Sequence, residues 1–272
     1  MSGKHRISFH LSAALLLIAL PLDARTADRE DDVRGLDVSS SPDRHLHRPI
    51  VIDQPGKYVL RRDLHAQDVA IVIRASQVTL DLDGHALSGP GGKGVGIRIE
   101  DSSGVAVHDG SIGWFGTGVE VLRSRNVSVK HLRIVGEDRG GTPPNVEIGV
   151  MIVNSRGVVI QDNVIVDTFL GVFVRGGGSA GNRIAGNVLT AGQNGAIGIC
   201  YNPAMNEGAA GPRGDLVYGN HVARFQTGIS LSAESVANII RENDIAYLMQ
   251  AISEASPNSN VLLENSSVQT FL

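Results

Sequence analysis

Arg98, Glu100 and Glu120 are the residues of this chain whose types and spacing could do chemistry together. Arg98 and Glu120 are separated by the same interval as Gly96 and Gly118, which open two copies of one short apolar motif. A repeat fold can bring residues at a fixed interval side by side. Paired carboxylates could then hold a hard cation such as Ca²⁺ against a uronate, while a guanidinium acts as a base or a clamp. We therefore take Arg98, Glu100 and Glu120 as candidate catalytic residues.

Further side chains accompany these residues in neighbouring copies of the motif. We expect them to bind an extended substrate, and they comprise two cations, two apolar side chains and the aromatic residue that opens a long loop: Arg74, Arg175, Met151, Phe173 and Tyr201. A second interpretation stays open. In it, the charged residues form salt bridges between exposed strands, each worth under about 1 kcal/mol, and loops cover the apolar strip.

The elements that must position these residues are short strands. The motif that begins at Gly96 returns at Gly118, and the motif at Gly149 returns at Gly171 after the same interval. Apolar residues alternate with polar ones over only a few positions in each copy, which is typical of strands. Such a period predicts a solenoid whose equivalent strands pair in parallel about 4.8 Å apart, with right-handed connections. The predicted interior consists of Ile97, Ile99, Val119, Val121, Val150, Ile152, Val172, Val174, Ile229 and Leu231.

Asparagines recur at one corner of the repeat, namely Asn163, Asn187, Asn220, Asn243 and Asn265. Together with the G-[IV]-x-[IVL] strand starts, over roughly Tyr58 to Val268, this column resembles the right-handed parallel β-helix proteins of the pectate-lyase-like superfamily, with the short repeats of carbohydrate-binding and sugar-hydrolase modules. The resemblance implies an all-β fold, a single-stranded right-handed parallel β-helix of about eight coils with an internal Asn ladder that satisfies buried polar groups. It also implies a site on the outer face of the first strand of each coil.

Two inserts border that outer face. Residues 136–147 lengthen the repeat that ends at Gly149, and residues 201–214 lengthen the repeat that ends at Asn220, both well beyond the common period. Long loops on one side of a solenoid are commonly its binding surface. The Gly-His-Gly and Arg-x-Lys tripeptides of the family's hydrolases are missing from the sequence, so whether the protein is an enzyme stays open.

A third group of residues combines imidazoles with carboxylates at the corner after the second strand: Asp83, His85, His108, Asp109, His131 and Asp162. Consecutive coils would bring them into one outer column, where they could bind Zn²⁺ or Cu²⁺. The chain as a short-repeat β-helix also resembles the periplasmic copper-maturation protein of the nitrous oxide reductase system, which favours a metal at this corner. Asp-Gly pairs are equally good turn residues, so no metal is assigned from the sequence.

The N-terminus predicts export. Lys4 and Arg6 precede an apolar run at residues 11–20, which makes residues 1–27 a signal peptide and the location periplasmic or secreted, with no membrane association once the signal is removed. Residues 28–49 mix charges of both signs with Ser and Pro and predict a disordered linker. The β-helix domain is expected over residues 50–272.

Composition narrows the range of partners. The net charge of −4 gives no electrostatic case for binding nucleic acid, and the single cysteine, Cys200, excludes an intrachain disulfide. The first hypothesis is a protein, catalytic or not, that binds an extended polysaccharide along the outer face of its first parallel sheet, without a cofactor. The alternatives are a lyase or epimerase of uronate polymers, which could use Ca²⁺, and a structural or assembly module whose oligomeric state the sequence leaves open.

Overall fold

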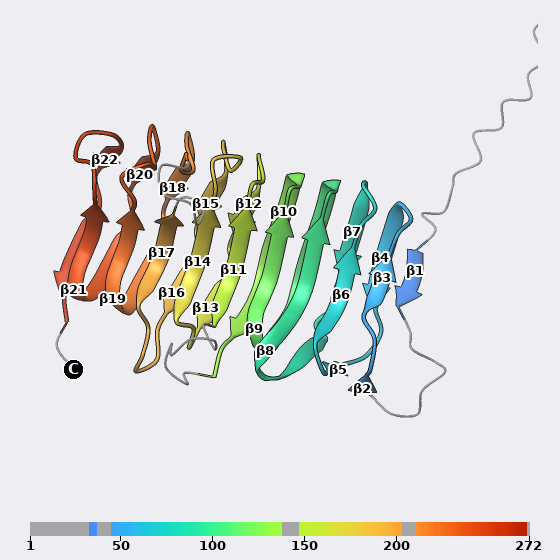
Figure 1. Ribbon diagram of the computed structural model, residues 1–272. Coiled ribbons are helices and arrows are strands. Elements are labelled where there is room, and N and C mark those ends of the chain that lie inside the picture. Colours follow the sequence, from blue (N-terminus) through green and yellow to red (C-terminus); the bar gives the residue numbers. More distant parts are fainter. Residues whose placement is uncertain (1–32, 37–44, 138–146, 203–209, 271–272) are drawn as a thin grey trace, which may run out of the picture. The chain divides into compact units, whose positions relative to one another are not determined.

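The computed structural model describes residues 33–36, 45–137, 147–202 and 210–270. These residues all belong to one compact unit, Asp32–Leu272, and their regular structure consists of strands (Figure 1). Among them, no helix has the length and apolar character needed to cross a membrane. The strands of these residues pair in parallel, each with the equivalent segment of a neighbouring turn, so the predicted parallel β-helix is confirmed.

The strands form three faces. The first face carries the candidate residues and contains β3 (Ile50–Ile52), β6 (Val69–Ile73), the last parts of β8 (Ala86–Glu100) and β9 (Ser103–Leu122), β11 (Ile148–Val153), β14 (Leu170–Arg175), β17 (Ile197–Asn202) and the last parts of β19 (His221–Leu231) and β21 (Asp244–Glu254). The second face contains β1 (Val33–Leu36), β4 (Gly56–Leu60), β7 (Val78–Asp81), the first parts of β9 and β10 (Arg125–Val135), β12 (Val159–Gln161), β15 (Arg183–Ala185), β18 (Leu216–Tyr218), β20 (Ile239–Arg241) and β22 (Val261–Leu263).

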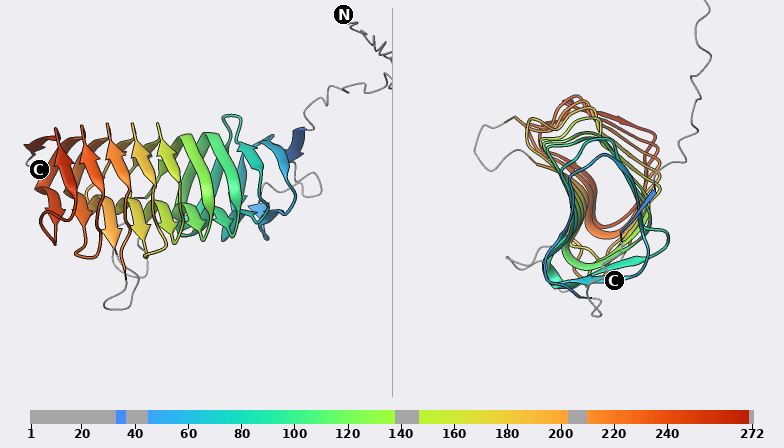
Figure 2. Two further views of the ribbon diagram at one scale, coloured as in Figure 1. Left: turned by 90° about the horizontal axis from the view of Figure 1, so that it is seen from above. Right: turned by 90° about the vertical axis from the view of Figure 1, so that its right-hand side faces the viewer.

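The third face closes the tube. It contains β2 (His45–Leu46), β5 (Leu64–Ala66), β13 (Val164–Val166), β16 (Val188–Thr190), β23 (Ser266–Gln269) and the remaining parts of β8, β9, β10, β19 and β21. The view along the axis in Figure 2 shows the faces around a common interior. The ten interior residues expected from the sequence are all buried there, each at most 1% exposed, because every second residue of a strand points inward.

Two of the three corners combine left-handed residues with buried polar ladders. The corner after the second face has positive φ at Asp109, His131 and Asp162 and is followed by the predicted asparagines, in which Asn187 donates from its backbone and side-chain nitrogens to Asn220 Oδ1. Two further ladders lie side by side in the chain at the corner after the first face, and the sequence analysis did not predict them. One consists of Asn182, Asp215, Asn238 and Asn260, and the other of Ser102, Ser124, Ser155 and Ser179. These ladders satisfy the backbone groups that the corners remove from the sheets.

The β-helix begins earlier than the sequence predicted. Within the expected linker, residues 28–49, Val33–Leu36 form β1 and pair with Lys57 to Leu60 of β4, so the prediction of a disordered linker is wrong for this part. Arg34 donates to the Tyr58 hydroxyl at 3.1 Å, which helps to hold β1 at the end of the stack. Edge pairing requires only free backbone groups, and composition therefore gave no sign of it. The predicted signal peptide, residues 1–27, lies outside the described residues.

Candidate functional site

Arg98 and Glu120 project outward from neighbouring strands of the first face. Their Cα atoms are partners between β8 and β9, and Arg98 Nε donates to Glu120 Oε2 at 2.5 Å. Arg74, directly after β6, donates from Nε to Glu100 Oε1 at 2.6 Å. The predicted meeting of these charged residues on consecutive turns is therefore confirmed.

Both candidate catalytic carboxylates are bound by a guanidinium in this arrangement. Glu120 is only 8% exposed, and its partner Arg98 covers the carboxylate from the preceding turn. Glu100 is bound in the same way by the more exposed Arg74. The geometry of these pairs matches the salt-bridge interpretation, and a catalytic role for Arg98, Glu100 and Glu120 stays a prediction.

The apolar strip lies beside these ion pairs. Met151 and Phe173 are register partners between β11 and β14, and both are half-buried; Arg175 lies further along β14 and is also half-buried. Tyr201 does not join them, because strand alternation turns it into the core, where it is 1% exposed. The assignment of Tyr201 as a substrate-binding residue is therefore wrong. Its neighbour Cys200 has the outward orientation, and burial raises the pKa of its thiol to about 12.

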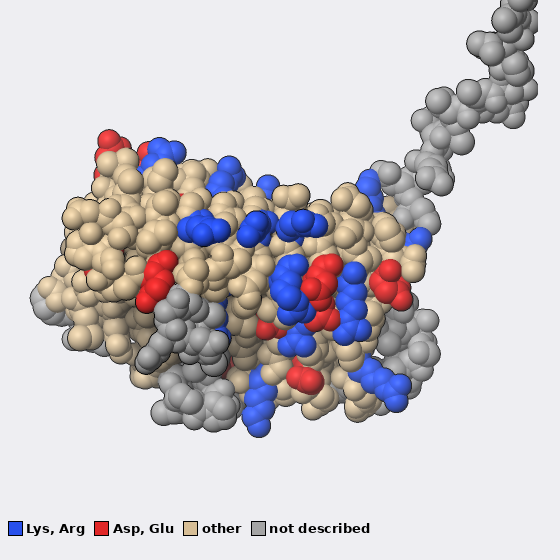
Figure 3. Space-filling view, turned by 45° about the horizontal axis from the view of Figure 1, so that its top comes forward, with Lys and Arg blue, Asp and Glu red and all other residues tan. Residues whose placement is uncertain are grey.

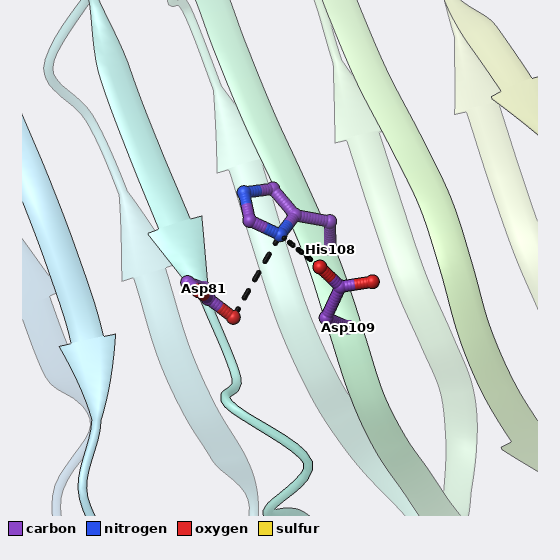
Figure 4. A group of neighbouring side chains, drawn as sticks. All are labelled: Asp81, His108 and Asp109. Carbon is purple, nitrogen blue, oxygen red and sulfur yellow. Dashed lines mark hydrogen bonds and ion pairs between the residues drawn. The ribbon is translucent and has the colours of Figure 1, made fainter.

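Imidazoles and carboxylates meet at the corner after the second face. His108 Nδ1 lies 2.9 Å from Asp109 Oδ2 and 3.7 Å from Asp81 Oδ1, as Figure 4 shows. One donor atom from each of these three residues fits within 4.8 Å of the others. His131 Nδ1 approaches Asp109 from the next turn at 3.3 Å, and His131 Nε2 lies 4.0 Å from Asp162. The corner thus presents alternating imidazoles and carboxylates to solvent.

The membership of this group differs in part from the expectation. Asp81, which the sequence analysis missed, is the register partner of His108, whereas the expected Asp83 lies 4.0 Å from Arg61 and the expected His85 bonds Asp63 at 3.2 Å. The cause is a corner of unequal length. Residues 82–85 separate β7 from its continuation, while only residues 109–110 occupy that place one turn later, so counting by the average period assigns the wrong aspartate.

A concave surface lies at the corner after the first face. Its cavity of about 370 Å³ is lined by Ser76, Asp101, Ser102, Ser103, Arg123, Ser124, Arg125, Asn154, Arg156 and Gly178. Arg125 and Arg156 are bridge partners on consecutive turns. Figure 3 shows Lys and Arg side chains in a row across successive turns on this side of the molecule. Sequence reasoning missed this surface, although Arg125 and Arg156 are separated by the same interval as Gly118 and Gly149.

Comparison with solved structures places the fold among β-helix proteins. The Dettilon tailspike protein is 12% identical at a TM-score of 0.55, over 83% of this chain and 54% of the tailspike, so the chain spans about half of that protein's length. PfbA, a surface adhesin of Streptococcus pneumoniae, is 10% identical at a TM-score of 0.47 over 82% of this chain and 81% of the adhesin. The periplasmic alginate epimerase AlgG D317A mutant is 14% identical at a TM-score of 0.41 over 88% and 84%. The tailspike likeness concerns the fold alone.

Sequence comparison identifies the family. No curated protein matches the chain. The family model described as "Periplasmic copper-binding protein (NosD)" matches residues 71–269, which is well over half of the 272 residues. The chain therefore belongs to the NosD family, a family of periplasmic proteins, and this confirms the predicted periplasmic or secreted location.

Proposed function

We propose that this protein binds copper as Cu²⁺ at the corner after the second face, with His108 as the central ligand. The observation that carries the proposal is the position of His108 Nδ1 between the carboxylates of Asp81 and Asp109, with donor atoms of all three within 4.8 Å. The family description, a periplasmic copper-binding protein, supports the same metal. In this function the copper ion is cargo that the protein takes up and passes on.

The chemistry of the three donors favours Cu²⁺ over Cu⁺. One imidazole nitrogen and carboxylate oxygens suit a divalent ion, and the Irving–Williams order puts Cu²⁺ first among the first-row divalent ions, whereas Cu⁺ prefers thiolate or thioether ligands. His131 lies outside this group of three, but its Nδ1 lies 3.3 Å from Asp109 on the following turn, the nearest further imidazole to the ion in this proposal. The side chains of the three donors are 30–52% exposed, so the ion would remain accessible for exchange. Protons compete for the same nitrogens, and binding should therefore weaken as the pH falls.

Titration of the purified chain with Cu²⁺, followed by calorimetry and electron paramagnetic resonance, tests the proposal. The wild type should show one principal site whose spectrum has nitrogen hyperfine coupling, and His108→Ala should lose it. His221→Ala is the matched control, because His221 Nδ1 also lies 2.9 Å from an aspartate, Asp244, but outside the three-residue group. Equal Cu²⁺ binding by the wild type and His108→Ala would contradict the proposal.

A second candidate function, binding of an extended polysaccharide, uses the first face. The observation that favours it is the row formed by Met151 and Phe173 on adjacent turns, which leaves two large apolar side chains half-buried beside Arg175. Such a row fits the apolar faces of sugar rings lying along the solenoid. Retardation in gels that contain neutral or uronate polymers tests it, with Met151→Ser/Phe173→Ser as the binding variant. Absence of retardation by every polymer would overturn this candidate.

The lyase or epimerase alternative requires a rearrangement of Arg98, Glu100 and Glu120. These residues would have to exchange their mutual ion pairs for contacts with a uronate and, in a lyase, with Ca²⁺. Release of unsaturated uronates in the presence of Ca²⁺, measured by ultraviolet absorbance, would support the lyase. A wild-type chain that binds uronate polymers but leaves them chemically unchanged would exclude both enzymatic alternatives for those polymers.

A further inference from the structure

Three arginines line the cavity at the corner after the first face, and two of them, Arg125 and Arg156, have guanidinium nitrogens without a hydrogen-bond partner among the described residues. Arg123 is bound by Asp101 in a bidentate pair, with both distances 2.8 Å. Arg156 donates from Nε to the Gly178 carbonyl at 3.2 Å, which leaves its terminal nitrogens available to a ligand. The side chain of Arg125 has no ion-pair or hydrogen-bond partner among the described residues.

The local charge opposes the charge of the whole molecule. The chain has a net charge of −4, yet three arginines and one aspartate line this cavity. Arg125 and Arg156 are both exposed, and the same bridge column continues through Ala180 to Arg213. Successive turns lie about 4.8 Å apart, so guanidinium groups recur along the solenoid axis with one neutral gap at Ala180.

We propose that this cavity binds an acidic polysaccharide, with Arg125 and Arg156 pairing with the carboxylates of its uronate units. The inference rests on the second candidate function, because it names the class of polymer and places the charged contact at the corner that borders the first face. Guanidinium groups recognise carboxylates by paired hydrogen bonds. Ser76, Ser103 and Asn154 line the same cavity and supply donors and acceptors for sugar hydroxyls.

The lining distinguishes this ligand from other polyanions. The described residues that line the cavity include no aromatic side chain, whereas proteins that bind single-stranded nucleic acids without sequence preference stack the bases on aromatic rings. Hydroxyl and amide groups line the cavity together with the arginines, which fits a ligand that carries both carboxylates and hydroxyls. A flat lipid surface would not fill a concave site of this size.

Binding of a defined oligouronate, a neutral oligosaccharide of the same length and a thymidine oligonucleotide tests the inference. We expect the oligouronate to bind and Arg125→Ala/Arg156→Ala to weaken its binding by about a hundredfold, since each lost charge-assisted bond pair costs about a factor of ten. The salt dependence should also become shallower, because fewer ionic contacts remain. Arg224→Ala is the matched control, since Arg224 is exposed and its side chain has no partner among the described residues, but it lies in the corner region of the third face.

The results distinguish failure of this inference from failure of the second candidate function. Neutral and acidic oligosaccharides that bind equally, with no effect of Arg125→Ala/Arg156→Ala but a loss in Met151→Ser/Phe173→Ser, would overturn this inference and leave the second candidate function intact. Absence of binding by every saccharide would overturn both. Tighter binding of the oligonucleotide than of the oligouronate would also overturn the inference. Unchanged circular dichroism and thermal midpoint of the double variant show that its fold is retained.

Discussion

Asp215 accepts hydrogen bonds from both amide groups of Asn182. Its Oδ1 receives the backbone N–H at 2.8 Å, and its Oδ2 receives the side-chain amide at 3.2 Å. Asn238 and Asn260 hold the same ladder position in the following turns, so Asp215 is a carboxylate in a column of amides, only 1% exposed. The Tyr201 hydroxyl lies beside it without making a regular hydrogen bond. Burial is the main cause that raises the pKa of Asp215 to about 6.

The first prediction concerns the pH dependence of stability. The pKa of Asp215 is near 3.8 in the unfolded chain and about 6 in the folded protein. The folded protein therefore binds a proton at Asp215 more tightly than the unfolded chain does. The stability that protonated Asp215 contributes is therefore present below 3.8 and is lost as the pH rises through about 6, by roughly 3 kcal/mol. Asp215→Asn should remove this loss, because an amide completes the ladder without a buried charge.

Urea unfolding at a series of pH values checks this prediction. The free energy of unfolding of Asp215→Asn minus that of the wild type should increase between about pH 4 and pH 6 and stay constant above about pH 7. Asp244→Asn serves as the control, because its exposed carboxyl has a lowered pKa, owing mainly to the Ser266 hydroxyl and His221, and its profile should run in the opposite direction. A difference for Asp215→Asn that is independent of pH would contradict the prediction.

The second prediction separates the two ion pairs of the first face. Arg98→Ala leaves the nearly buried Glu120 carboxylate unpaired and should lower the free energy of unfolding by about 1–3 kcal/mol. Arg74→Ala removes the partner of Glu100 from an arginine that is 61% exposed and should cost under about 1 kcal/mol. Thermal or urea unfolding of the two variants measures the difference. Equal losses would show that burial does not distinguish the pairs.

The third prediction concerns the middle of the first Asn ladder. Asn187 is fully buried, accepts from both nitrogens of Asn163 and donates to the Ile160 carbonyl and to Asn220. Asn187→Ala leaves several of these groups without partners and should cost about 3 kcal/mol or more. Asn265→Ala, at the less buried end of the ladder, should cost less, because water can replace its bonds. Unfolding midpoints in urea compare the two, and a larger loss at Asn265 would be the wrong order.

The fold could be predicted well from the sequence because each period of the sequence corresponds to one turn of the β-helix. One alternation of apolar residues and one column of asparagines recur at nearly constant intervals, and both interior and ladder follow from that repeat. The second Asn ladder could also have been predicted from the sequence. Asn182, Asp215, Asn238 and Asn260 follow one another at the same successive intervals as Asn187, Asn220, Asn243 and Asn265. It was missed because Asp215 interrupts the run of asparagines.

The candidate sites were harder to predict because they depend on corners. The longer corner between Asp81 and Ala86 shifts the register partner of His108 from Asp83 to Asp81. Tyr201 was assigned to a loop, but β17 continues to Asn202, and alternation therefore places the ring inside. Whether the side chains around Arg125 enclose a cavity depends on the width of the corner after the first face, and this width cannot be predicted from the intervals between residues in the sequence.

The fourth prediction concerns the glycines that open the strands of the first face. A Cβ on Gly149 would lie 2.5 Å from the Gly171 carbonyl oxygen and 2.5 Å from Ile165 Cγ2, so the adjacent turn approaches too closely for any side chain. Gly149→Ala should therefore lower the free energy of unfolding by about 2–3 kcal/mol. The register of β19 and β21 places Ala251 at this position in the last turn of the first face, where no further described strand stacks against it.

Gly181→Ala is the comparison that isolates close approach from backbone conformation. Gly181 has a φ of 63° and nothing within 4 Å of a built Cβ, and Ala237 adopts a φ of 56° at the equivalent corner of a later turn. The fold therefore accommodates alanine in this left-handed conformation, at a cost of about 1 kcal/mol. Unfolding in urea should rank Gly149→Ala as the more damaging change. The reverse order would mean that left-handed backbone strain, and not the spacing between turns, requires glycine in this solenoid.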